Sequence, residues 1–491
     1  MKHLVLSLLA LVLLVCGLTV AASFFLKSTV EDMTREAIMS MAGPGESALE
    51  DVTFSPLTRE ITITGWRTRH STSDGPVSAH APTVHGRVTF RGVFACMPVL
   101  GNLINNADTM VPVLDNVRAR DLAWSSAERH VTIARVQVDA IRIRYGLLQQ
   151  YTLGLRPPFA QAVTGIHVDR VRADNLDVVL TNPLNAMQFA ASEAELLDAC
   201  GTGARSCAFK NVTWTLPGEL VTGKEVVLRD IKVSPALLSE LVALSNRRRT
   251  PRANSYLVEA LVANGPLVGR ASVKGLERTA AGDGGKAPFF MESCDLVWTD
   301  DKPFNVEAHV RGARIPQRLV QQGGLPIALD GMEEISLEAD LASSGIDEVH
   351  ETGLVRLKDL ADISYTMDLD SATMNVTSLE LTLRDYGLAA RMGRTISPDP
   401  HAASMILKAS VASLCQADNA SDRQTCQKIA DFVDMPGSIT LKKRASVPPA
   451  TMLELALNVL SARLGSIFEA EVVPGGASLT SQSEKIFGQG R

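Results

Sequence analysis

Residues 131–143, VTIARVQVDAIRI, indicate the fold class of this chain. Apolar side chains occupy every second position in three short groups, at 131–133, 136–138 and 141–143. A period of two is typical of a β-strand that buries one face. The phase of the alternation slips between the groups, which indicates a bulge or a bend in one long strand.

The same alternation recurs far from this stretch, at residues 60–66, 304–310, 335–341 and 379–383. Turn-forming residues rich in Gly, Pro, Asn and Asp separate such segments. We therefore predict a mainly β fold of the α+β class, with an elongated, twisted, mostly antiparallel sheet and a few packing helices.

A short phrase recurs in the strand-like regions, as EDVTF at 50–54, DNVRA at 115–119 and KNVTW at 210–214. Because each copy precedes more strand-like sequence, we expect it to mark the start of a strand. Its spacing is irregular, which favours a sheet grown by successive hairpins over a solenoid of fixed period.

Three segments have the 3.6-residue apolar period of a helix. They are residues 235–245, a shorter one around 429–433, and the strongest at Pro448–Leu464. In the last, the prolines stand at the N-terminal end, where a helix tolerates them. Its expected apolar stripe consists of Met452, Leu455, Ala456, Val459 and Leu460.

The N-terminus carries an apolar run of 23 residues, Leu4–Leu26, without a charged side chain. As a helix it would be about 35 Å long and would cross a hydrocarbon core of about 30 Å. We expect residues 1–27 to form a single membrane anchor with a cytoplasmic N-terminus. A cleaved signal peptide, with small residues at 19–22, is the main alternative, and a lipoprotein site at Cys16 is a weaker one.

The remaining chain is divided by composition and turn signals. We expect a juxtamembrane helix at 28–45, a first β-rich region at 46–285 and a second at 286–491 that contains the C-terminal helix 448–464. The chain carries a net charge of −6 with a pI near 5.9, which argues against nucleic acid as a partner. Aromatic residues are 5% of the chain, too few for a stacking platform.

Six cysteines lie outside the apolar run, and an even number suits an oxidising compartment. We expect local disulfides Cys200–Cys207 and Cys415–Cys426, and Cys96 with Cys294 as the remaining pair; buried thiols are the alternative. No Cys-x-x-Cys accompanies them, so we expect no zinc site.

The other polar clusters in the sequence do not indicate a catalytic or metal site. His70, His80 and His85 are expected in a solvated loop instead of a metal site, because their spacing implies no shared face. Four arginines follow the predicted helix at 235–245, where they complement its C-terminus or contact lipid phosphates. These are Arg247, Arg248, Arg249 and Arg252. No nucleophile motif occurs, and we expect no catalytic residue, cofactor or metal.

Residues 49–66, LEDVTFSPLTREITITGW, follow the apolar run directly, and residues 379–388 have a similar pattern. This layout resembles AsmA-like proteins of the Gram-negative envelope. The resemblance covers about a third of the chain. It implies an inner-membrane anchor, a β-rich periplasmic body and a role in envelope or lipid homeostasis. It supplies no catalytic residues.

We therefore expect a single-pass protein of the bacterial inner membrane whose bulk is periplasmic and which is not an enzyme. Its sheet would either bind lipid along an open apolar groove or pack that face into a closed core. A closed core would favour an interaction scaffold for envelope proteins. An envelope hydrolase is the least favoured reading.

Overall fold

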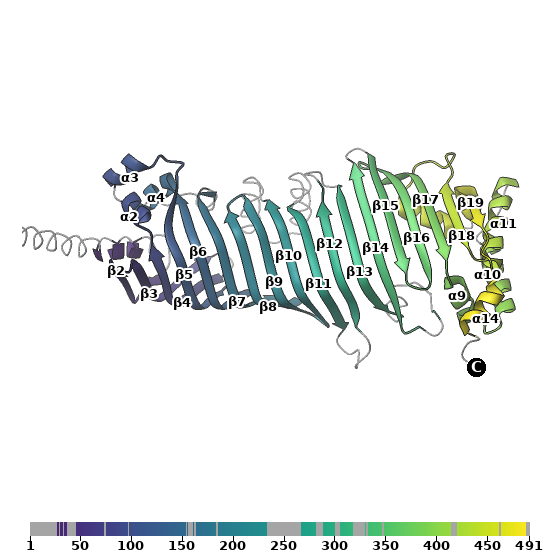
Figure 1. Ribbon diagram of the computed structural model, residues 1–491, viewed down its shortest axis with the longest axis horizontal. Coiled ribbons are helices and arrows are strands. Elements are labelled where there is room, and N and C mark those ends of the chain that lie inside the picture. The colour runs from purple at the N-terminus through teal and green to yellow at the C-terminus, as the bar shows by residue number, and fades with distance from the viewer. Residues whose placement is uncertain are drawn as a thin grey trace, which may run out of the picture. The chain divides into compact units, whose positions relative to one another are not determined.

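The computed structural model describes residues 27–28, 30–32, 34–36, 46–72, 75–96, 98–153, 155, 161, 164–182, 185–232, 267–280, 288–299, 305–317, 329, 332–345, 348–413, 420–460 and 463–487. The chain divides into two compact units, Met1–Val268 and Gly269–Arg491, called unit 1 and unit 2 below. Figure 1 labels the elements of both.

Unit 1 is built from antiparallel strands in chain order. Each strand from β2 to β10 pairs with the next one, and β1 adds to β3. The strands are β1 (Glu46–Ala48), β2 (Asp51–Ser55), β3 (Glu60–Thr72), β4 (Gly75–Val88), β5 (Met110–Ser125), β6 (Arg129–Arg144), β7 (Ile166–Asn182), β8 (Asn185–Cys200), β9 (Gly203–Leu216) and β10 (Glu219–Lys232).

Unit 2 repeats this construction. Each strand from β11 to β19 pairs with the next one in antiparallel fashion. The strands are β11 (Val268–Ala280), β12 (Phe289–Trp298), β13 (Val306–Pro316), β14 (Glu334–Gly345), β15 (Glu348–Leu357), β16 (Ala361–Asp370), β17 (Asn375–Asp385), β18 (Ser438–Lys443) and β19 (Phe468–Val473). The prediction of a mainly β, mostly antiparallel fold is confirmed.

A line of left-handed residues crosses the sheet of unit 1. Gly65, Asp121, Asn175 and Asn211 have φ values of 63°, 50°, 53° and 48°. Their neighbours pair in register, so these residues share one transverse row on β3, β5, β7 and β9. Gly, Asn and Asp are the residues that adopt this conformation most readily. Every second strand is therefore bent at the same level.

The bend explains the first phase slip in residues 131–143. Asp121 and Asn175 lie opposite Ala134, between the apolar groups 131–133 and 136–138. The rings of Phe189 and Phe209 touch across this line, with centroids 5.5 Å apart. On β8, the residue that pairs with Phe209 lies five positions from Phe189. On a flat strand five positions span roughly 16 Å, which would keep the two rings apart. The sheet must therefore fold toward the face that carries both rings.

The recurring phrase lies inside strands at two of its three occurrences. Asn116, with φ of 51°, and Asn211 stand within β5 and β9 and not at their starts. The expectation of strand starts was wrong there, because the phrase marks a left-handed bend. Asn116 faces Asp139, between the groups 136–138 and 141–143, where the second phase slip occurs.

The helices whose bounds the structure describes in unit 1 are short. They are α2 (Phe90–Cys96), α3 (Pro98–Ile104) and α4 (Tyr145–Thr152). Ala95 of α2 and Tyr145 and Leu148 of α4 bury Val111 at one end of β5. The main helix-to-strand contacts in the described part of unit 1 are α2 with β5 and α4 with β6. This part of the core therefore lies at the ends of two strands.

Unit 2 is helix-covered at its C-terminal end. Its helices are α9 (Leu388–Ile396), α10 (Pro400–Ser413), α11 (Ala420–Asp434), α12 (Met452–Leu460), α13 (Leu464–Ile467) and α14 (Leu479–Phe487). Ile429 and Phe432 of α11 pack on Ile439 and Ala470. Leu455 of α12 joins a core with several residues of β15–β17, β19 and α13.

The helix expected at 448–464 forms as the shorter α12. Thr451 and Glu454 begin it with a capping box, in which each side chain accepts a hydrogen bond from the other residue's backbone N–H, at 3.2 and 2.9 Å. Leu455 is buried as expected. Met452, expected on the same buried stripe, is 51% exposed, because α12 contacts the core through only part of its circumference.

The membrane-anchor prediction concerns residues outside the described part of the chain. Among the helices that the structure describes, none combines the length and apolar character needed to cross a bilayer. The expected juxtamembrane segment is helical at 28, 30–32 and 34–36. In it, Glu31 Oε1 accepts a hydrogen bond from the backbone N–H of Phe54 at 2.7 Å. The helix expected at 235–245 also lies outside the described residues.

Asp385 gives the stability of unit 2 a pH dependence. It is 7% exposed and accepts a hydrogen bond from the N–H of Ala389 at the start of α9, at 2.9 Å. Burial raises the pKa of its carboxyl despite that contact. Folding therefore favours the protonated acid, and this contribution to stability is lost as pH rises through the raised pKa.

We expect Asp385→Asn to gain stability relative to the wild type as pH increases from 4 to 7. Thermal unfolding at pH 4, 5, 6 and 7 measures the difference. A gap that stays constant over this range, or grows toward low pH, would contradict the assignment.

Candidate functional site

The sheet of unit 1 has one continuous apolar face. Directly opposed residues of antiparallel strands point to the same side, so the register identifies its rows. We call this surface the apolar face of unit 1. Its central rows, from β3 to β10, consist of Trp124, Val131, Val178, Phe189, Trp214 and Val221; Trp66, Ala81, Leu122, Ile133, Leu176, Ala191 and Val212; Ile63, Val84, Ala119, Val136, Ala173, Ala194, Phe209 and Val226; and Ile61, Val117, Val138, Val171, Leu196, Cys207 and Leu228.

Most of these side chains are half-buried, and Trp214 is 45% exposed. The indole N–H of Trp66 is buried and has no hydrogen-bond partner in the described part of the chain. Since the described helices of unit 1 contact mainly β5 and β6, they leave the rows on β7–β10 uncovered. The bend at Asp121 and Asn175 makes this face the inner side of a fold in the sheet.

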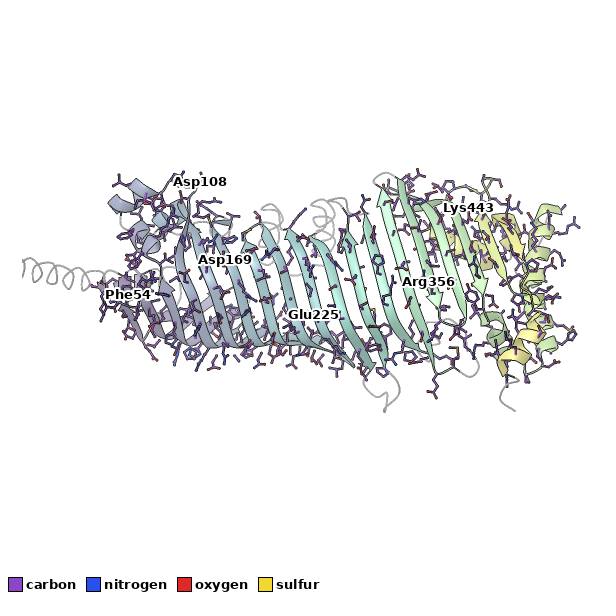
Figure 2. All side chains as sticks on the ribbon, in the orientation of Figure 1. Phe54, Asp108, Asp169, Glu225, Arg356 and Lys443 are labelled. Carbon is purple, nitrogen blue, oxygen red and sulfur yellow. The ribbon has the colours of Figure 1, made fainter. Side chains whose placement is uncertain are left out.

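The opposite face of unit 1 carries charges. Arg135 faces Asp174 at 3.7 Å, and Lys210 pairs with Glu193 at 2.8 Å. Figure 2 labels Asp169 and Glu225, which lie on this charged face of β7 and β10. Ion pairs of this exposed kind add little stability. They keep one side of the sheet in water, while the apolar side gains free energy by contact with apolar groups.

Unit 2 has a similar apolar face, partly covered. Val273, Cys294, Val310 and Ala339 form one row that continues through β15–β19. Helix α11 packs over β18 and β19, whereas the described helices make no comparable contact with β11–β13. In the described part of unit 2, helices therefore cover the apolar rows at the C-terminal end, and no described helix covers the rows on β11–β13.

The tryptophans lie on the apolar faces of the two units. The chain contains four, and Trp66, Trp124 and Trp214 lie on the apolar face of unit 1. Trp298 lies in the row of Val306 and Met367 on the corresponding face of unit 2. Tryptophan fluorescence therefore reports on these faces alone.

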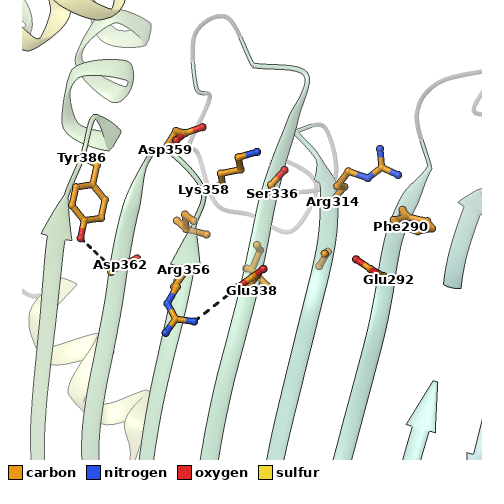
Figure 3. Close-up of a pocket in the computed structure, with 14 residues that line it drawn as sticks. Phe290, Glu292, Arg314, Ser336, Glu338, Arg356, Lys358, Asp359, Asp362 and Tyr386 are labelled. Atoms are coloured by element: carbon orange, nitrogen blue, oxygen red, sulfur yellow. Dashed lines mark hydrogen bonds and ion pairs between the residues drawn. The ribbon is translucent and has the colours of Figure 1, made fainter. Parts of the chain in front are cut away.

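The polar side of unit 2 is hollowed (Figure 3). This cavity measures about 770 Å³ and crosses β12–β16, with Tyr386, just after β17, at one end. Arg314 lies over the ring of Phe290 at 4.6 Å, and Tyr386 donates a hydrogen bond to Asp362 at 3.0 Å. Arg356 faces Glu338 at 3.9 Å. Of these three contacts, only that between Arg356 and Glu338 joins opposite charges, so the lining keeps charged groups of both signs.

A cluster on the charged face of unit 1 has residue types that bind metals. The candidate ligand atoms of His167, Asp169 and Asp198 all lie within 4.8 Å of one another. Arg142 holds Asp169 at 2.7 Å, and Arg205 holds Asp198 at 2.9 Å. Because each carboxylate already pairs with a guanidinium, the arrangement matches an ion-pair network better than a cation site. The sequence indicated nothing here, since the residues meet only through the pairing of β7 and β8.

The cysteine predictions were largely wrong. Cys96, Cys200, Cys207 and Cys294 are free thiols. On β8, the residue that pairs with Cys207 lies four positions from Cys200, which is roughly 13 Å along the strand. A disulfide needs Cα atoms within about 7 Å, so Cys200 and Cys207 are too far apart to form one.

Three of the free thiols, Cys96, Cys207 and Cys294, are half-buried. Burial raises the pKa values of Cys207 and Cys294, and raises that of Cys96 to about 11. Cys426 takes part in a disulfide bond, and its expected partner Cys415 lies outside the described residues, so that pairing stays a prediction.

The predicted arginine and histidine sites are not found where the sequence predicted them in the described part of the chain. Arg247, Arg248, Arg249 and Arg252 lie outside the described residues. The histidines expected in a solvated loop were misplaced, because His70 belongs to β3 and His80 and His85 belong to β4.

Comparison with family models, with curated proteins and with solved structures finds no match to this chain.

Proposed function

We propose that this protein is a membrane-anchored periplasmic protein that binds lipid acyl chains along the apolar face of unit 1. Its role would lie in envelope homeostasis, by holding or transferring lipid, with no chemical reaction. The observation that carries the proposal is an apolar surface on β7–β10 that no described helix covers, with a charged face on the other side of the same strands.

The physical argument rests on apolar contact area. Each methylene removed from water contributes about 0.8 kcal/mol, so a chain lying across several rows would be held by many small contributions. A partly exposed apolar surface of this extent is a typical sign of a partner that covers it. Trp214, which is 45% exposed, and the half-buried valines and leucines of the neighbouring rows supply such contacts.

The four tryptophans provide the test. The segment 28–491, which lacks the predicted anchor, is purified and its lipid is extracted for mass spectrometry. Phospholipid carrying bromine on its acyl chains is then added, since bromine quenches tryptophan on contact. We expect co-purified phospholipid and a fall in fluorescence that saturates with brominated lipid.

The same lipid without bromine is the control and should leave the intensity unquenched. A lipid-free protein whose fluorescence does not respond to brominated chains would refute lipid binding.

An interaction scaffold is the second candidate, and an observation on unit 2 favours it. Helix α12 buries Leu455 but exposes Met452 at 51%, Leu453 at 69% and Leu457 at 53%. An apolar outer stripe on a helix fits contact with another protein. In that case the purified segment would be free of lipid, and charged substitutions at Leu453 would release a protein partner.

A further inference from the structure

The charged face of unit 1 contains a second hollow of different chemistry. It measures about 1090 Å³ and lies across β3–β6. Its lining includes Arg87, Arg118, Arg120 and Arg135, with Glu60 as the only carboxylate among the lining residues. The hollow therefore concentrates positive charge in a chain whose net charge is −6.

The register places like charges together in this hollow. Arg120 on β5 stands directly opposite Arg135 on β6. Like charges directly opposite each other on a sheet destabilise it. Arg135 is partly compensated by Asp174, at 3.7 Å, on the far side of β6. The described part of the chain supplies no ion-pair partner for Arg120 or Arg87, although Glu60 is the cross-strand neighbour of Arg87.

The backbone conformation at Asn116 helps to orient the guanidinium of Arg118 in the hollow. Asn116, in the left-handed conformation, accepts a hydrogen bond from Nε of Arg118 at 3.1 Å. This contact uses one donor and leaves the terminal nitrogens of the guanidinium for a ligand. Guanidinium groups bind phosphate oxygens through paired hydrogen bonds, which is a geometry that lysine does not offer.

We infer that this hollow binds a ligand carrying two or more phosphate groups, held by Arg87, Arg118, Arg120 and Arg135. A single phosphate would engage only part of a cavity of this size. The shared chemistry is a cluster of phosphate charges, supplied either by a soluble polyphosphate or by anionic lipid headgroups at a membrane surface. The inference is independent of the proposed lipid function, because the hollow lies on the face opposite the apolar rows.

The test compares two doubly substituted full-length proteins. Arg120→Gln with Arg135→Gln removes the facing pair. The matched control, Arg129→Gln with Arg229→Gln, removes two exposed arginines from the same unit outside the hollow. Inorganic tripolyphosphate is titrated calorimetrically into each protein at low and moderate salt. Flotation with vesicles of phosphatidylglycerol and of phosphatidylcholine forms the second arm.

We expect the wild type and the control to bind tripolyphosphate, more weakly as salt rises, and the facing-pair variant to bind at least about tenfold more weakly. If the facing-pair variant loses binding to phosphatidylglycerol vesicles but not to tripolyphosphate, the phosphate groups that the hollow binds are lipid headgroups at a membrane surface. Since the variant relieves a like-charge contact, its melting temperature should match or exceed that of the wild type. A wild type that binds neither probe, an equal loss in the control, or a lowered melting temperature would overturn the inference.

Discussion

Val171→Glu should reduce the lipid bound by the purified protein more than tenfold while leaving it folded. Val171 is half-buried in the middle of the apolar face, on β7, flanked by Val138 and Leu196. An acyl chain lying over this row would have to desolvate the new carboxylate. That costs several kcal/mol, and each 1.4 kcal/mol is a factor of about ten in affinity. Lipid extraction and quenching by brominated phospholipid both measure the loss.

The same substitution separates an open groove from a closed core. If water reaches Val171 in the absence of lipid, the charge stays solvated and the melting temperature changes little. If another part of the chain covers the row, the unpaired carboxylate is buried and unit 1 unfolds. Thr215→Glu, at an exposed position of β9 on the charged face, is the matched control and should keep both lipid and stability. Loss of folding in Val171→Glu alone would support the scaffold hypothesis.

Arg444→Met should lower the free energy of unfolding of unit 2 by about 3–5 kcal/mol. The side chain of Arg444 is 13% exposed. Its Nε donates to the carbonyls of Gly465 and Phe468, at 3.0 and 3.2 Å, and Nη2 donates to Thr425 at 3.1 Å. Asp422, only 4% exposed, lies 3.8 Å from Nη2. One guanidinium therefore joins α11 to the segment that leads into β19.

Methionine fills a similar volume but leaves a buried carboxylate without its cation. Urea unfolding followed by circular dichroism measures the loss, and hydrogen exchange should locate it in α11, β18 and β19. Adding Asp422→Asn to Arg444→Met should recover part of the stability, because it removes the uncompensated charge. Arg356→Met is the control, since Arg356 is 46% exposed, and should cost at most about 1 kcal/mol. Equal losses in the two single variants would refute the role of Arg444.

The local pattern predicted the strands well because strand side chains alternate whatever their partners are. Residues 131–143 indicated both a strand and its bends, and β6 (Arg129–Arg144) spans them all. Contacts between side chains on different strands were predicted poorly. Cys200 and Cys207 are near in sequence, but the hairpin register separates them along the ladder. Met452 follows the helical period, but only the packing of α12 decides which side of it is buried.

The sequence alone determined that this chain builds a mostly antiparallel sheet from alternating strands, and that the strand at 131–143 carries a bulge or bend where its apolar phase slips. Period and turn residues are local properties, so they are visible without a fold. Only the tertiary structure decided that the bends align in one row, that β7–β10 lack a described helix over their apolar side, and that Arg120 faces Arg135. These facts depend on strand register, which is set by the summed pairing of distant residues.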